Sequence, residues 1–194
     1  MNGRSSLESS PLRAKDAATP EFETEIRLRY SAMAARIAAG VPLTLLHIGA
    51  EQIVVASGNG IDPAAVLVLA IGSRKTAGDH FKHEPPTPFE METAIATVED
   101  ELAPARTMIA GGSTLISTDA AVREIALIAG VAPGAELTLP LDLLERTFAR
   151  LAAVTLGRPA SQEGIPTGAA FAATLLILRE FMHHLKFSSI TVRT

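Results

Sequence analysis

The segment LTLLHIGAEQIVVASG, residues 43–58, decides the fold because it holds two apolar runs around a short polar turn. The first run ends at Ile48 and the second begins at Ile53, with Gly49 opening the connection between them. Short runs rich in Leu, Ile and Val predict strands, and so short a connection predicts an antiparallel pair. The turn also has the outline of a phosphate-binding loop, although Glu51 stands in it instead of glycine or a hydroxyl.

The rest of the chain extends this hairpin into an α/β pattern. Apolar spacing predicts a helix over 21–39, and the sequence TPFE at residues 87–90 predicts a capping box at the start of another helix. Asp119 is expected to cap a helix that Gly130 ends. The remaining expected elements are strands at 43–48, 52–57, 65–71, 107–110 and 187–192, a helix at about 141–155, and a helix that starts after Gly168 and reaches about His184. This order predicts a ribonuclease-H-like fold, a mixed five-stranded sheet with helices on both faces.

Composition restricts the classes of function. The chain has 194 residues, of which 47% are hydrophobic, and this suits one domain with a sizeable core. A formal charge of −4 gives no electrostatic reason to expect nucleic acid or an anionic membrane as a partner. The absence of cysteine excludes disulfides, thiolate catalysis and cysteine-ligated metal sites. With no signal-peptide pattern and no apolar stretch long enough to span a membrane, the expected location is the cytoplasm.

The chain is expected to divide into a tail and one domain. Residues 1–20 are polar and lack periodicity, and they predict a flexible tail. Residues 21–194 contain every periodic segment and form the predicted domain.

An ordered series of short motifs resembles the second core domain of the exopolyphosphatase / guanosine pentaphosphate phosphohydrolase (Ppx/GppA) family. That family belongs to the sugar kinase–actin–Hsp70 superfamily. Each motif alone is weak, but all occur in order and with matching spacing across residues 21–194. The matching segments are 25–30 (EIRLRY), 47–55 (HIGAEQIVV), 71–76 (IGSRKT), 85–88 (PPTP), 110–114 (AGGST) and 161–171 (SQEGIPTGAAF).

The resemblance implies a phosphate site, but the matching residues depart from the family pattern. His47 stands where the family has an aspartate, and Ala50 and Glu51 replace two loop glycines. A residue with a Cβ in a left-handed conformation costs about 1–2 kcal/mol, so the turn is expected to adopt a different shape. A Glu51 carboxylate about 4 Å from a phosphate oxygen would cost about 4 kcal/mol at an effective dielectric constant near 20, unless a metal ion or a partner cation intervenes. The turn is therefore expected to repel phosphate.

Several residues retain the pattern, and each has two interpretations. By resemblance, Glu25 is the general base or water-positioning residue; the alternative is a solvated helix residue paired with Arg29. Gly49 and the group Gly111, Gly112, Ser113 and Thr114 are the candidate phosphate-binding residues. The latter group is expected to follow a strand and precede a helix, where its N–H groups could hold an anion. A plain strand-to-helix turn is the alternative.

Other polar residues are interpreted as surface features. His80 and His83 lack a third ligand at metal-site spacing, and His183 and His184 are sequential and face different directions on a helix. Arg74 and Lys75 could meet an anion or lie in a solvated turn. No metal site is assigned.

The preferred hypothesis is a degenerate Ppx/GppA phosphatase-like domain that binds a ligand or a partner. In the family, the active site lies between two such domains, and residues 1–20 contain no loop of the form D-x-G-[ST]-N-S from the first domain. A homo-oligomer or a separate chain supplying the first domain would cover the exposed face, and a phosphate-containing molecule is the candidate ligand. The alternative hypothesis is an active phosphoanhydride hydrolase completed by another chain, using Mg²⁺, Glu25 and the Gly111–Gly112 turn. The third hypothesis is that the chain is a fragment of a gene whose first half was lost or mis-annotated.

Overall fold

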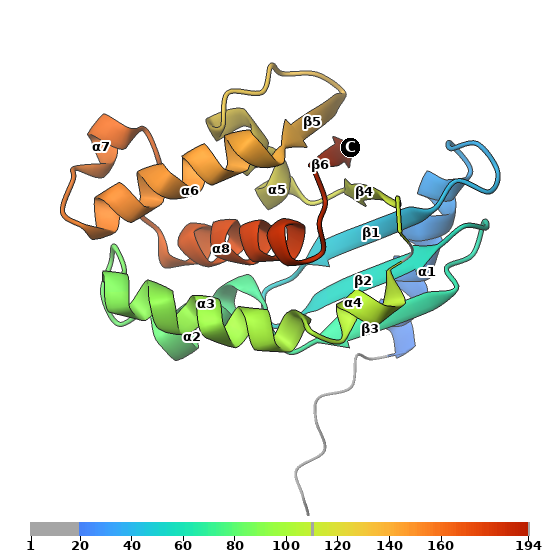
Figure 1. Cartoon of the computed structure of the whole chain (residues 1–194), viewed down its shortest axis with the longest axis horizontal. Coiled ribbons are helices and arrows are strands. Elements are labelled where there is room, and N and C mark those ends of the chain that lie inside the picture. The colour runs from blue at the N-terminus through green and yellow to red at the C-terminus, as the bar shows by residue number, and fades with distance from the viewer. Residues whose placement is uncertain (1–19, 110, 194) are drawn as a thin grey trace, which may run out of the picture.

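The computed structural model describes residues 20–109 and 111–193 (Figure 1). Residues 1–19, 110 and 194 lie outside this description, and with them nearly all of the segment for which a flexible tail is predicted.

Six strands form one mixed sheet in the order β3-β2-β1-β4-β6-β5. β1 pairs antiparallel with β2 and parallel with β4, and β4 pairs parallel with β6. The outer pairs, β2–β3 and β5–β6, are antiparallel. The mixed sheet is confirmed, with six strands in place of the predicted five. Their bounds are β1 Leu43–Ile48, β2 Ile53–Gly58, β3 Ala65–Leu69, β4 Thr114–Ser117, β5 Glu136–Pro140 and β6 Ser189–Arg193.

The hairpin of residues 43–58 is confirmed, because Ile48 pairs with Ile53 and Leu43 with Gly58. Two other strand predictions are corrected. For the segment 107–110, of which residue 110 lies outside the described residues, residues 107–109 form no strand: helix α4, Ala105–Met108, covers the first two, and β4 follows the glycine turn instead. β4 buries Leu115 and Ile116 in the sheet. The additional strand, β5, alternates buried leucines with exposed residues along the far edge of the sheet.

Helices cover both faces of the sheet, as predicted (Figure 1). α1 lies on one face, where Ile26 and Tyr30 pack against Leu43, Leu45 and Val54. The larger hydrophobic cluster lies on the other face and contains most of α8, which runs across the centre of the view. The helices are α1 Pro20–Ala34, α2 Ser73–His80, α3 Pro88–Leu102, α4, α5 Ala120–Ile128, α6 Leu141–Thr155, α7 Ala160–Glu163 and α8 Ala169–His184.

The sequence misses α2 and the single turn α7. Only Thr76 and Ala77 of α2 are buried, so this helix shows little apolar periodicity. The capping box of α3 is confirmed, because the Thr87 hydroxyl accepts from the Glu90 N–H and the Glu90 carboxylate accepts from the Thr87 N–H.

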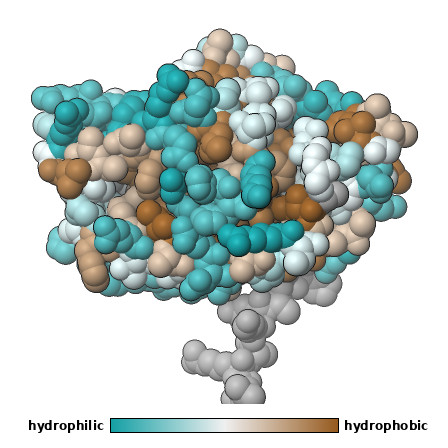
Figure 2. All heavy atoms as spheres, in the orientation of Figure 1, coloured by the Kyte–Doolittle hydropathy of each residue, from teal (hydrophilic) through white to brown (hydrophobic). Residues whose placement is uncertain are grey.

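The visible surface mixes residue types. On the face shown in Figure 2, hydrophilic residues cross the middle of the molecule and apolar residues are interspersed among them. No helix in the described part of the chain combines the length and apolarity needed to cross a bilayer.

Candidate functional site

Three segments meet where the parallel strands β1 and β4 end. They are the end of β1 with His47, the turn formed by residues 49–52, and the connection from β4 to α5 with Asp119. Ligands of α/β proteins bind at the carboxyl ends of parallel strands, so this end of the sheet is the first candidate site.

The turn closes as a four-residue hairpin loop. The Gly49 N–H donates to the Gln52 carbonyl at 3.0 Å. Among the described residues, the only non-glycine with a positive φ is Lys186, and Gly49 is not among the glycines with a positive φ. This agrees with the expectation that the turn adopts a different shape, because Ala50 and Glu51 avoid the left-handed conformation.

The carbonyl groups of this turn point at the start of α2. Ser73 N–H donates to Gly49 O at 2.9 Å, and the N–H groups of Arg74 and Lys75 donate to Ala50 O at 2.9 and 3.0 Å. The first N–H groups of a helix otherwise lack intrahelical partners and commonly bind anions. In this protein the turn occupies three of them.

Gly72 makes this close contact possible. A Cβ on Gly72 would lie 2.5 Å from each of Ala50 O, Gln52 N and Glu51 C, all of which are backbone atoms. Only glycine fits at this position without displacing the turn.

A part-buried His–Asp pair fixes the two strand ends to each other. His47 Nδ1 donates to Asp119 Oδ1 at 2.6 Å, and the Ile48 N–H donates to Asp119 Oδ2 at 2.7 Å. The Asp119 side chain is only 7% exposed. Asp119 occupies the N-cap position of α5, as predicted, but its side chain makes no cap hydrogen bond because both oxygens face β1.

Glu51 has a cationic partner. Arg74 Nε donates to Glu51 Oε1 at 2.7 Å, and both side chains are largely exposed. A partner cation would offset the negative charge of Glu51, and Arg74 supplies such a cation from α2. The repulsion expected from Glu51 is therefore reduced, and the occupied backbone N–H groups become the stronger obstacle to phosphate.

Glu25 lies on α1 and pairs with Arg29, with 2.6 Å between Oε1 and Nη2. Its side chain is 53% exposed. This is the partner that the plain amphipathic-helix interpretation named.

The structure separates the candidate phosphate-binding residues. Gly49 follows the end of β1, whereas Thr114 pairs with Leu43 at its beginning. Gly111, Gly112, Ser113 and Thr114 thus lie at the opposite end of the sheet from Gly49. The expectation that they follow a strand and precede a helix is wrong, because they follow α4 and lead into β4, which begins at Thr114.

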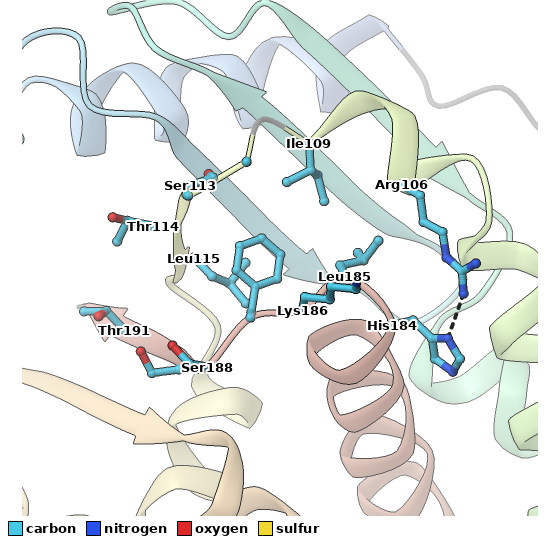
Figure 3. Close-up of a pocket in the computed structure, with 14 residues that line it drawn as sticks. Arg106, Ile109, Ser113, Thr114, Leu115, His184, Leu185, Lys186, Ser188 and Thr191 are labelled. Carbon is cyan, nitrogen blue, oxygen red and sulfur yellow. Dashed lines mark hydrogen bonds between the residues drawn. The ribbon is translucent and has the colours of Figure 1, made fainter.

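The Gly111–Thr114 segment lines a pocket of about 730 Å³ between the starts of β4 and β6 (Figure 3). Arg106 and Lys186 bring positive charge to its wall. Ser113 Oγ lies 2.6 Å from Thr44 Oγ1, so its hydroxyl is bonded to β1.

Sequence reasoning missed two clusters. The His47–Asp119 pair joins residues separated by 72 positions, and no local pattern signals such a contact. The surface interpretation of His184 is wrong, because its side chain is 19% exposed and contacts Glu99 and Glu180. The i, i+4 spacing of Glu180 and His184 was the available signal for the second cluster.

No family model and no curated protein sequence matches the chain. Solved structures, in contrast, do match the chain. A Ppx/GppA enzyme from Aquifex aeolicus superposes with a TM-score of 0.69 at 17% identity, covering 88% of this chain and 58% of that one. An exopolyphosphatase from Cytophaga hutchinsonii gives a TM-score of 0.67 at 15% identity, covering 89% of this chain and 59% of that one. A third structure, described as an exopolyphosphatase-like protein, gives a TM-score of 0.63 at 14% identity, covering 89% of this chain and 68% of that one.

These matches concern the fold, and the chain spans less than two thirds of the length of the first relatives it matches. They agree with the ordered motifs over residues 21–194. The chain therefore has the α/β fold seen in these Ppx/GppA and exopolyphosphatase structures.

Proposed function

We propose that this chain is a Ppx/GppA-like domain that does not hydrolyse phosphoanhydrides by itself and that acts as a binding module. The observation that carries the proposal is the occupation of the anion-binding groups where β1 ends. The turn carbonyls take the N–H groups that begin α2, and the Gly49 N–H is bonded inside the turn.

The residues at this end of the sheet do not fit Mg²⁺. The buried carboxylate there, Asp119, already accepts from His47 and from the Ile48 N–H. Mg²⁺ prefers oxygen ligands in near-octahedral geometry, and a histidine in place of an aspartate removes one such ligand.

The competing proposal is an active hydrolase completed by another chain, with Glu25 as the water-positioning group and Gly111 and Gly112 holding phosphate. The exposure of Glu25, its pairing with Arg29 and the placement of the two glycines before β4 weigh against it. A general base must lie within hydrogen-bond reach of the proton that it takes.

A phosphate-release assay separates these proposals. The purified chain is incubated with Mg²⁺ and either polyphosphate or guanosine pentaphosphate, beside a Glu25→Gln variant. We expect no release above the protein-free control, and no difference between the two proteins. Release that requires Mg²⁺ and disappears in Glu25→Gln would refute the degenerate function.

The partner proposed for the module is a second copy of the chain. β3 is an edge strand with the sequence AVLVL, and four of its five residues are only partly buried. Apolar edge strands without charged residues are prone to pair with another chain. A separate chain that supplies a first domain is the competing partner.

A further inference from the structure

We infer that Glu99, Glu180 and His184 form a binding site for one divalent transition-metal ion of the zinc class. One ligand atom from each residue lies within 4.8 Å of the other two. This cluster lies away from the carboxyl ends of β1 and β4, because it joins α3 to the last turns of α8, where His184 also lines the pocket at the starts of β4 and β6.

The helices hold the three side chains in a fixed arrangement. Glu180 and His184 are four residues apart on α8 and therefore share one face of that helix. Glu99 reaches them from α3, which packs against α8 (Figure 1). His184 Nε2 lies 2.9 Å from Glu99 Oε1 and 3.3 Å from Glu180 Oε2.

The Glu180 carboxylate is the observation that indicates a ligand. Its side chain is 0% exposed, although it sits in a helix where an apolar residue would pack. Oε1 accepts from Arg179 Nη1, but the buried Oε2 accepts no hydrogen bond, although His184 Nε2 lies 3.3 Å from it. A buried carboxylate oxygen without a donor is destabilising, and a bound cation would satisfy it.

The tautomer of His184 identifies the atom that would bind the ion. Arg106 Nη2 lies 2.8 Å from His184 Nδ1 (Figure 3), and a guanidinium can only donate. Nδ1 is therefore the acceptor, and in a neutral ring Nε2 carries the hydrogen that faces Glu99. A metal ion would replace this hydrogen, which would move to Nδ1. Arg106 would then have to turn away, and as an exposed side chain at the pocket wall it has room to do so.

The donor set selects the class of ion. One imidazole nitrogen and two carboxylates are typical ligands of Zn²⁺ and related ions, whereas Ca²⁺ and Mg²⁺ prefer oxygen alone. Among divalent ions of the first row, Zn²⁺ binds such sites more tightly than Mn²⁺ or Fe²⁺. Zinc is therefore the probe of choice.

Isothermal titration of the untagged full chain with ZnCl₂ tests the site. We expect one zinc ion per chain, and an affinity lower by about tenfold or more in His184→Gln and in Glu99→Gln. Because Glu99 is partly exposed, Glu99→Gln should retain the fold, even if substitution of the buried Glu180 disrupts it. The matched control is His183→Gln, which removes an exposed neighbouring imidazole and should bind zinc like the parent chain.

Arg106→Gln gives an independent readout, because losing the cation and the donor opposite Nδ1 should tighten zinc binding. The proposal is overturned if the parent chain binds no zinc, or if His184→Gln and Glu99→Gln bind it as tightly as the parent. Loss of zinc binding in Arg106→Gln would also contradict it.

Discussion

At the scale of single residues, Gly72 determines how closely the β1–β2 turn can approach α2. Replacement by alanine places a Cβ 2.5 Å from three backbone atoms of the turn, so either the turn or the start of α2 must move. We expect Gly72→Ala to lower the free energy of unfolding by about 2–3 kcal/mol, as forced backbone shifts in packed regions do. Urea denaturation followed by circular dichroism measures this loss.

The control for this substitution is Gly78→Ala, in the same helix. Apart from its chain neighbours and the backbone of its own helix, no described atom lies within 4 Å of the position that a Gly78 Cβ would take. Alanine is the better helix former by about 0.5–1 kcal/mol, so this variant should be as stable as the parent or more stable. Equal losses in the two variants would mean that α2 itself, and not its contact with the turn, is sensitive.

At the scale of elements, the start of α3 depends on a charged cap. The Glu90 carboxylate accepts from the Thr87 N–H, and further hydrogen bonds from His83 and the Lys82 N–H help to lower its pKa to about 2. A lowered folded-state pKa gives stability that is present above the ordinary value near 4.5 and is lost as the pH falls toward 2.

This linkage predicts a specific pH dependence. Between pH 5 and pH 2, the parent chain should lose stability faster than Glu90→Gln, whose amide keeps an acceptor but does not titrate. Thermal melting at each pH measures the difference, and Glu92→Gln, an exposed change on the same helix, should follow the parent. Parallel curves for the parent and Glu90→Gln would show that the charge of the cap does not matter.

Elements were predictable where their signals are local. The hairpin of residues 43–58 and the Thr87–Glu90 capping box each lie within one short segment, and both are confirmed. β4 was misplaced because its identity comes from pairing with β1, more than sixty residues earlier. β5 was not predicted for the same reason: its alternation of exposed and buried residues identifies a strand only when β5 is paired with β6.

At the scale of the whole molecule, the site could be predicted only in outline. The motifs indicated the right fold, but the family resemblance grouped Gly49 and the Gly111–Thr114 segment in one phosphate site. The parallel pairing of β1 with β4 places them at opposite ends of the sheet. The pair that does close the strand ends, His47 and Asp119, comes from segments that only the folded chain brings together. Contacts between distant segments are set by packing, and a single sequence does not display them.

The edge strand β3 predicts how two copies of the chain associate. β3 has no strand beyond it in the described chain, and its exposed backbone groups and apolar side chains would be satisfied by pairing with a second copy. Light scattering after size exclusion should therefore give the mass of two chains. A lysine on an edge strand opposes such pairing, so Ala65→Lys should give the mass of one, whereas Ala121→Lys, on the exposed side of α5, should leave the dimer intact. A parent chain that remains monomeric at high concentration would contradict pairing through β3 and would favour a different chain as the partner.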